Sequence, residues 1–179
     1  MSEIQQIISA KLICFKCGGN FSLSRDTLIC SHCGSEFHFN RNFIEFDDFK
    51  FKDQYGAMFG EQAQEYEQEH FLNEDFSKSL ALPFKKILLK YIKLPAENAL
   101  EIGCGTGVLT RGLRHHGVVQ NMLATDLSRE MLDEAVRKET SASTIYLIQN
   151  ASKLNVKDRS FDLVLGSAVL HHILELKNS

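Results

Sequence analysis

The sequence predicts an α/β fold in which a partial doubly wound, Rossmann-like sheet follows a small β module that binds a metal. Three observations support this prediction. From residue 81 onward, short apolar segments alternate with amphipathic segments of helical spacing. A glycine-rich turn, Gly103–Gly107, follows the first of these apolar segments. Two Cys-x2-Cys pairs stand near the N-terminus, in a chain without an export signal.

Pattern and charge divide the chain into three predicted parts. Residues 1–48 form the metal-binding module, residues 49–80 an acidic connector, and residues 81–179 the α/β unit. The connector is distinguished by its charge, because residues 51–80 carry two Lys against seven Asp and Glu. A loosely amphipathic helix is predicted within it. The α/β unit carries 13 Lys and Arg against 10 Asp and Glu, an excess too small to indicate a nucleic-acid partner.

The elements of the α/β unit follow from spacing and from Pro and Gly. We predict a first helix that begins at Pro83, since proline suits the first helical turn, and that ends before Pro95. The remaining pattern predicts four strands, at 98–102, 122–126, 144–149 and 161–166. It also predicts helices at 107–116 and from 128 to about 138, the second capped by Ser128.

The paired cysteines predict a structural zinc site. Two knuckles separated by twelve residues present four thiolates in a closed tetrahedral arrangement, from Cys14, Cys17, Cys30 and Cys33. Disulfides and an iron–sulfur centre are the alternatives, both disfavoured, the first by a reducing cytoplasm and the second by this spacing. His38 is expected to face solvent rather than ligate. Since the module has few apolar residues, we expect it to need metal to stay folded.

The glycine turn reads Glu101-x-Gly103-x-Gly105-x-Gly107, which differs from the dinucleotide pattern G-x-G-x-x-G. Asp126 ends the next strand, where a carboxylate can accept hydrogen bonds from both hydroxyls of a ribose. The helix N-terminus after the turn suits an anionic group. A ligand with a free ribose and an anionic end is S-adenosylmethionine. The alternatives are that the glycines form only a tight turn and that Asp126 only caps the next helix.

These residues resemble the class I S-adenosylmethionine-dependent methyltransferases. "LEIGCGTG" is similar to the family's first motif and "ATDLSREML" to its second. "NASKLNVKDRSFDLVLGSAVLHHI" is similar to its third and fourth motifs, so the resemblance runs from about Leu82 to the C-terminus. It implies methyl transfer and a seven-stranded sheet in the order 3-2-1-4-5-7-6. This chain is expected to hold only the half-sheet 3-2-1-4, apparently truncated after the fourth strand.

The resemblance also implies roles at the donor site. The glycines should line the methionine end, the acidic residue before them should steady the loop or the ammonium group, and Asp126 should hold the ribose. Adenine should contact the residue after Asp126 and the pair that follows the third strand, whose first member, Asn150, stands where the family often has Asp. The implied donor-binding residues are Glu101, Gly103, Cys104, Gly105, Gly107, Asp126, Leu127, Asn150, Ala151 and Ser167.

No catalytic base can be assigned from the sequence. Cys104 is expected to be a small buried side chain in the turn rather than a nucleophile. Ser167 should lie near the transferable methyl group. His171 and His172 could contact the substrate or have a structural role, and the structural role is favoured.

The cysteine module resembles the zinc ribbon of a small family that activates tRNA and protein methyltransferases, although Phe15 and His38 depart from its usual prolines. The leading prediction is a cytoplasmic methyltransferase with an unspecified acceptor. The alternative is a non-catalytic, shortened methyltransferase-like protein whose ribbon binds a partner. Self-association through an exposed fourth-strand edge is also predicted. No membrane partner and no nucleic-acid partner are expected.

Overall fold

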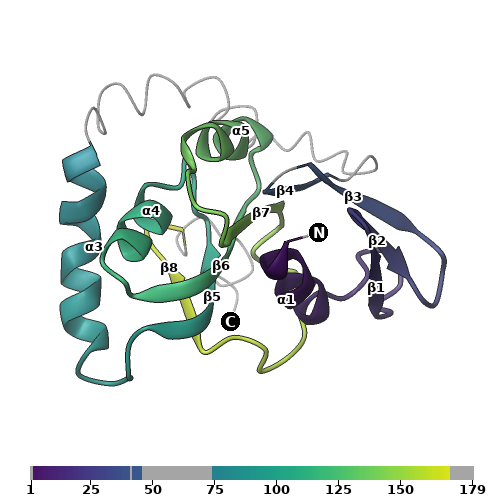
Figure 1. Ribbon diagram of the computed structural model, residues 1–179, viewed down its shortest axis with the longest axis horizontal. Coiled ribbons are helices and arrows are strands. Elements are labelled where there is room, and N and C mark those ends of the chain that lie inside the picture. The colour runs from purple at the N-terminus through teal and green to yellow at the C-terminus, as the bar shows by residue number, and fades with distance from the viewer. Residues whose placement is uncertain (1, 41, 46–73, 170–179) are drawn as a thin grey trace.

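The computed structural model describes residues 2–40, 42–45 and 74–169. Their strands form one eight-stranded sheet in the order β1-β2-β3-β4-β7-β6-β5-β8 (Figure 1). The N-terminal elements are α1 (Glu3–Lys11), β1 (Phe21–Ser24), β2 (Thr27–Cys30), β3 (Glu36–Asn40) and β4 (Phe43–Glu45). The α/β elements are α3 (Glu74–Leu88), β5 (Ala96–Ile102), α4 (Val108–His115), β6 (Val119–Asp126), α5 (Arg129–Lys138), β7 (Thr144–Ile148) and β8 (Leu163–Gly166).

The α/β part confirms the predicted fold class. Strands β7, β6, β5 and β8 are parallel neighbours, which is the order 3-2-1-4 in their sequence numbering. Gly107 begins α4 in a left-handed conformation with φ of 76°, which glycine adopts without steric cost. Ser128 caps α5, since its hydroxyl accepts a hydrogen bond from the Met131 N–H. Among the described strands, β8 is the last at its edge.

Helix α3 corrects the prediction for its start. It begins at Glu74, so Pro83 lies inside the helix rather than in its first turn. Pro83 is exposed, whereas the opposite side of α3 packs tightly on α4. A Cβ added to Gly112 of α4 would lie 2.1 Å from the Ser77 carbonyl oxygen, and the Ser77 hydroxyl donates to the Val108 carbonyl at 2.8 Å. This close helix–helix contact outweighs the hydrogen bond that an internal proline removes.

Helix α1 is an element that the sequence pattern did not predict. Its apolar residues Ile4 and Ile8 are buried, as is Leu12 just beyond it. The chain after α1 is tied to the segment that precedes β8, because the Ile13 N–H donates to the Asn155 carbonyl at 3.1 Å. Helix α1 therefore covers the face of the sheet opposite to α4 and α5 (Figure 1).

The N-terminal strands continue the sheet of the α/β part. Strand β4 pairs with β7 in parallel, with Phe43 opposite Tyr146 and Ile44 opposite Leu147. The Tyr146 N–H donates to the Asn42 carbonyl at 2.6 Å. One apolar cluster spans both parts and contains Ile4, Ile8, Leu12, Cys14, Leu28, Cys30, Phe37, Phe39, Ile44, Leu100, Leu123, Ile145 and Leu147. The N-terminal module thus shares its hydrophobic core with the α/β unit.

The predicted connector helix lies largely outside the described residues, as do His171 and His172. None of the described helices combines the length and the apolar character that a membrane span requires.

Candidate donor site and metal centre

The predicted donor-site residues converge at the carboxyl ends of four neighbouring parallel strands. Ile102 at the end of β5 lies opposite Thr125 of β6 and Gly166 of β8. Asp126 lies opposite Ile148 of β7. The segments that begin at Gly103, Leu127, Gln149 and Ser167 therefore leave the sheet at one edge, where open α/β sheets bind their ligands.

The three glycines of the turn have different surroundings. All three have positive φ, at 68°, 54° and 76° for Gly103, Gly105 and Gly107. An added Cβ would meet Val169 at Gly103, and the Tyr146 hydroxyl and Ala135 at Gly107. At Gly105 it would meet no atom within 4 Å. The bare, open surface of the turn is therefore at Gly105, whereas Gly103 and Gly107 are required for packing within the protein.

Asp126 holds the turn in shape. Its carboxylate accepts hydrogen bonds from the Gly105 N–H at 2.8 Å and the Ser128 N–H at 2.9 Å. Burial raises the pKa of Asp126, and the backbone N–H groups of Ser128, Gly105 and Leu127 oppose that increase. One carboxylate thus joins the turn after β5 to the start of α5. Each of its oxygens can still accept a further hydrogen bond.

Glu101 is buried beneath the turn, with 1% of its surface exposed. Its carboxylate accepts a hydrogen bond from the Thr110 hydroxyl of α4 at 2.5 Å, and its carbonyl accepts one from the Thr125 hydroxyl at 2.9 Å. Burial is the main reason that the pKa of Glu101 is raised to about 7, with Thr110 opposing the shift and Asp126 adding to it. In this geometry the side chain connects β5 to α4.

The other predicted donor-site residues lie near the same edge. Cys104 is buried, and burial raises its pKa well above the ordinary value, so its thiol is protonated and unsuited to nucleophilic attack. The Asn150 side chain accepts from the Ser152 N–H at 2.9 Å. The half-buried residues of this set are Leu127, Asn150, Ala151 and Ser167.

Three residues near the site were not singled out from the sequence. Thr110 and Thr125 bind Glu101, but an ordinary threonine on a helix or a strand gives no sequence signal of such a contact. Gln149 is buried, and its amide oxygen accepts from the Asn155 N–H at 2.8 Å. Its amide nitrogen has no hydrogen-bond partner among the described residues. A polar residue at the end of an apolar strand was the signal that could have identified it.

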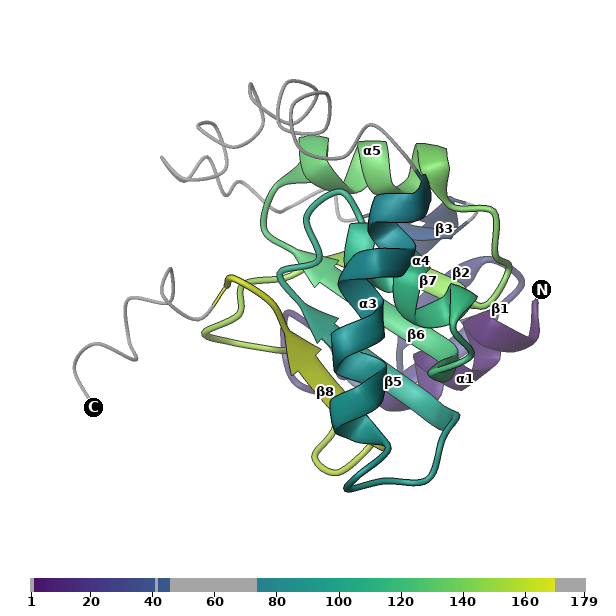
Figure 2. The same ribbon diagram turned by 90° about the vertical axis from the view of Figure 1, so that its left-hand side faces the viewer.

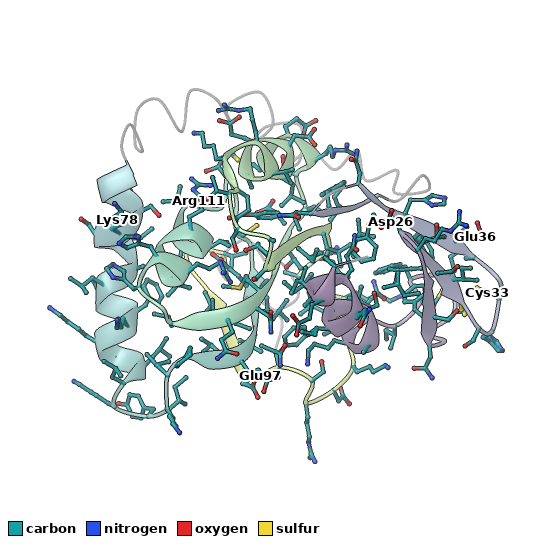
Figure 3. All side chains as sticks on the ribbon, viewed as in Figure 1. Asp26, Cys33, Glu36, Lys78, Glu97 and Arg111 are labelled. Carbon is teal, nitrogen blue, oxygen red and sulfur yellow. The ribbon has the colours of Figure 1, made fainter. Side chains whose placement is uncertain are left out.

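The four cysteines form a compact cluster. Their sulfur atoms all lie within 4.8 Å of one another, with Cys14 Sγ 3.7 Å from Cys33 Sγ and Cys17 Sγ 3.5 Å from Cys30 Sγ. A tetrahedral zinc site with Zn–S bonds of about 2.3 Å requires sulfur–sulfur distances of about 3.8 Å. The cluster therefore fits a zinc ribbon. Cys33 lies at the outer end of the ribbon in Figure 3.

The two knuckles around the cluster have equivalent backbone hydrogen bonds. The Gly18 N–H donates to the Cys14 carbonyl at 2.8 Å, and the Gly34 N–H donates to the Cys30 carbonyl at 3.0 Å. Both glycines have positive φ, at 75° and 71°. Two equivalent turns therefore present the two pairs of sulfur atoms to one point. The exposed His38 bonds to the Thr27 hydroxyl at 3.0 Å and stays outside the cluster.

Comparison with known protein families shows which family the α/β unit matches. A family model described as a methyltransferase domain matches residues 100–179, the segment that contains the glycine turn and Asp126. Residues 100–179 thus carry a methyltransferase domain. The sequence-based assignment of this family is thereby confirmed.

Similar proteins agree with this assignment. An uncharacterised methyltransferase of Schizosaccharomyces pombe is 30% identical over 48% of this chain and 34% of its own length. A malonyl-[acyl-carrier protein] O-methyltransferase of Serratia marcescens is 32% identical over 46% of this chain and 31% of its own length. The chain thus spans about a third of the length of these curated relatives.

A solved structure similar to this chain comes from the complex between the Haloferax volcanii Trm112 methyltransferase activator and a methyltransferase. The TM-score is 0.47 at 21% identity, over 65% of this chain and 48% of the other.

Proposed function

We propose that this chain binds S-adenosylmethionine at the turn after β5 and takes part in methyl transfer to an acceptor. The observation that supports this most strongly is the pairing of Gly105 and Asp126. The glycine leaves open space beside the turn, and the carboxylate next to it is already fixed by two backbone N–H groups. Such preorganised groups bind a ligand at a lower entropic cost than mobile ones.

The residues at this edge fit the donor. Asp126 would accept hydrogen bonds from the two ribose hydroxyls with the lone pairs that the backbone leaves available. The N–H groups at the start of α4 would face the carboxylate of the methionine part. Leu127 and the Asn150–Ala151 pair would contact adenine, and Ser167 would lie nearest the methyl group.

The chain's role in the reaction would be alignment. When bound, the sulfonium donor supplies an activated methyl group for an in-line displacement. The turn and Asp126 would orient the donor and hold it at the sheet edge while an acceptor approaches. We assign no general base, since a base is needed only where the acceptor must lose a proton.

We also propose that the four cysteines bind one structural zinc ion. The distances between their sulfur atoms and the repeated knuckles support this assignment. Four thiolates fill a tetrahedral shell, so the metal would hold the fold and take no part in chemistry.

The alternative is a non-catalytic protein whose ribbon binds a partner. One observation weighs against a freely available ribbon, because its last strand, β4, is already paired with β7 inside the chain. We therefore place the ribbon with the methyltransferase domain as a structural extension of the sheet.

Isothermal titration calorimetry with S-adenosylmethionine tests the donor site. We expect micromolar binding, and we expect Asp126→Ala to weaken it by about 1–3 kcal/mol, the usual effect of losing a charged hydrogen-bonding partner. Asp133→Ala is the matched control, since Asp133 is an exposed carboxylate on α5. Folded protein that does not bind the donor at millimolar concentration would contradict the proposal, as would equal weakening by the two variants.

A further inference from the structure

Helix α3 presents an unusual outer surface. Ser79, Leu82, Lys86 and Lys90 follow i, i+3, i+4 spacing and are exposed, so they lie on one side of the helix and its final turn. Figure 2 shows α3 as the outermost element on this side, in front of α4 and β5. The inner side of the helix carries Ser77 and Ala81 against α4.

Large apolar side chains near the end of α3 and in the turn after it are also exposed to solvent. The exposed fraction is 55% for Ile87, 58% for Leu89 and 79% for Tyr91, and 40% for Leu82 one turn earlier. Four exposed large apolar side chains within ten residues are more than the scattered single residues that an ordinary protein surface carries. They indicate a surface that contacts something apolar.

The same segment is basic, although the chain as a whole has a net charge of −3 and Glu74, Asp75 and Glu97 flank the segment. Residues 76–96 contain five Lys and no Asp or Glu. The Lys85 ammonium donates to the His116 carbonyl at 2.7 Å, whereas Lys86, Lys90 and Lys93 are exposed. Figure 3 shows Lys78 on α3, whereas Asp26 and Glu36 lie on the ribbon at the other end of the molecule. Lys86, Lys90 and Lys93 therefore lie in the same short segment as the exposed apolar side chains.

We propose that the outer surface of α3 and its final turn, residues 79–93, docks on the surface of an anionic lipid bilayer. Lysines attract anionic headgroups, and neighbouring Ile, Leu and Tyr side chains insert at the boundary between headgroups and acyl chains. Nucleic acid would match the lysines but would leave Ile87 and Leu89 without apolar partners. The proposed contact is peripheral, because only side chains enter the bilayer surface. It differs from the sequence-based expectation of no membrane partner.

Docking on this surface leaves the donor site accessible. The final turn of α3 leads into β5 at Ala96, so it lies at the amino ends of the parallel strands. Gly105 and Asp126 lie at the carboxyl ends of the same strands. A strand of seven residues is about 23 Å long. The two surfaces are therefore at opposite ends of β5, and donor binding and lipid binding can be measured independently.

Co-sedimentation with vesicles tests the proposal. The full chain is mixed with vesicles of phosphatidylcholine alone, or with phosphatidylcholine containing phosphatidylglycerol, at low and at high salt. We expect binding to the anionic vesicles, weakened by salt and at least about tenfold weaker to neutral vesicles. Thermal melting confirms that each variant is folded.

Two double charge-reversal variants distinguish the effect of the position of the lysines on vesicle binding from the effect of the protein's net charge. Lys86→Glu with Lys90→Glu should weaken binding to anionic vesicles by at least about tenfold. Lys153→Glu with Arg159→Glu changes net charge equally at exposed positions elsewhere and should leave binding near wild type. Ile87→Ser with Leu89→Ser should also weaken binding, because insertion requires the apolar side chains.

Four results would overturn the proposal. They are equal binding to neutral and anionic vesicles, no binding to either, equal loss in the two charge-reversed proteins, and unchanged binding of the Ile87 and Leu89 variant. Sedimentation velocity could give a fifth result that overturns the proposal. A wild-type dimer that Ile87→Ser with Leu89→Ser converts to monomer, without vesicle binding, would assign the surface to self-association.

Discussion

At the scale of single residues, the burial of Glu101 predicts a pH dependence of stability. Because the pKa of Glu101 is raised from 4.5 to about 7, the folded protein holds its proton more tightly than the unfolded chain. The stabilisation is complete below pH 4.5 and is lost as pH rises through about 7. With about 1.4 kcal/mol per pKa unit, the expected loss in the free energy of unfolding is about 3 kcal/mol.

Urea denaturation from pH 4.5 to 8 measures this effect. Glu101→Gln can still accept the Thr110 hydrogen bond but cannot titrate, so the decline in stability over this range should be smaller by that amount. Glu97→Gln on the same strand is exposed and provides the matched control. If the free energy of unfolding fell equally with pH in Glu101→Gln and in wild type, the buried carboxylate would not be the cause of the pH dependence.

Sequence reasoning located the residues whose positions depend on local chemistry. Asp126 was placed beside the glycine turn because it ends the strand next to β5, and its 2.8 Å contact with the Gly105 N–H bears out that proximity. The different environments of Gly103 and Gly107 were not predictable, because Val169 and Tyr146 come from distant parts of the chain. A glycine pattern shows that a Cβ is excluded, but not whether a ligand or a side chain excludes it.

At the scale of secondary structure, weakening strand β4 should destabilise the α/β part as well as the hairpin that β4 forms with β3. Ile44 is fully buried and lies opposite Leu147 of β7. Ile44→Ala should reduce the free energy of unfolding by about 2–5 kcal/mol, the usual cost of such a core deletion. Amide exchange should also become faster at Tyr146, whose N–H donates to the Asn42 carbonyl beside β4. The exposed Val164→Ala on β8 should change stability by less than about 0.5 kcal/mol.

The elements that were predicted well are those with a strong local pattern. Strands β5 to β8 and helices α4 and α5 follow apolar runs, glycines and the Ser128 cap. Helix α1 has nine residues and is stabilised by packing on the shared core, so its local signal is weak. The start of α3 was misplaced because its contact with Gly112, which no local pattern reveals, outweighs the preference of Pro83 for a first turn.

At the scale of the whole molecule, removal of zinc should weaken the methyltransferase domain as well as the ribbon. Cys14 and Cys30 belong to the same buried cluster as Leu123 of β6 and Leu147 of β7. A metal that binds only the folded ribbon stabilises everything folded with it. If chelation costs about 3 kcal/mol, the melting temperature of a protein of this size should fall by about 6–12 °C.

Mass spectrometry under native conditions should find one zinc ion per chain, absent after chelation and in Cys33→Ser. Cys104→Ser is the matched control, because Cys104 lies outside the cysteine cluster and should leave zinc content unchanged. Amide exchange then distinguishes a shared core from two independent units. In a shared core, loss of zinc speeds exchange at Leu147, which pairs with β4, more than at Leu165 on the far strand β8. Faster exchange confined to residues 12–40 would mean that the ribbon unfolds alone and that the continuous sheet does not couple the metal to the donor site.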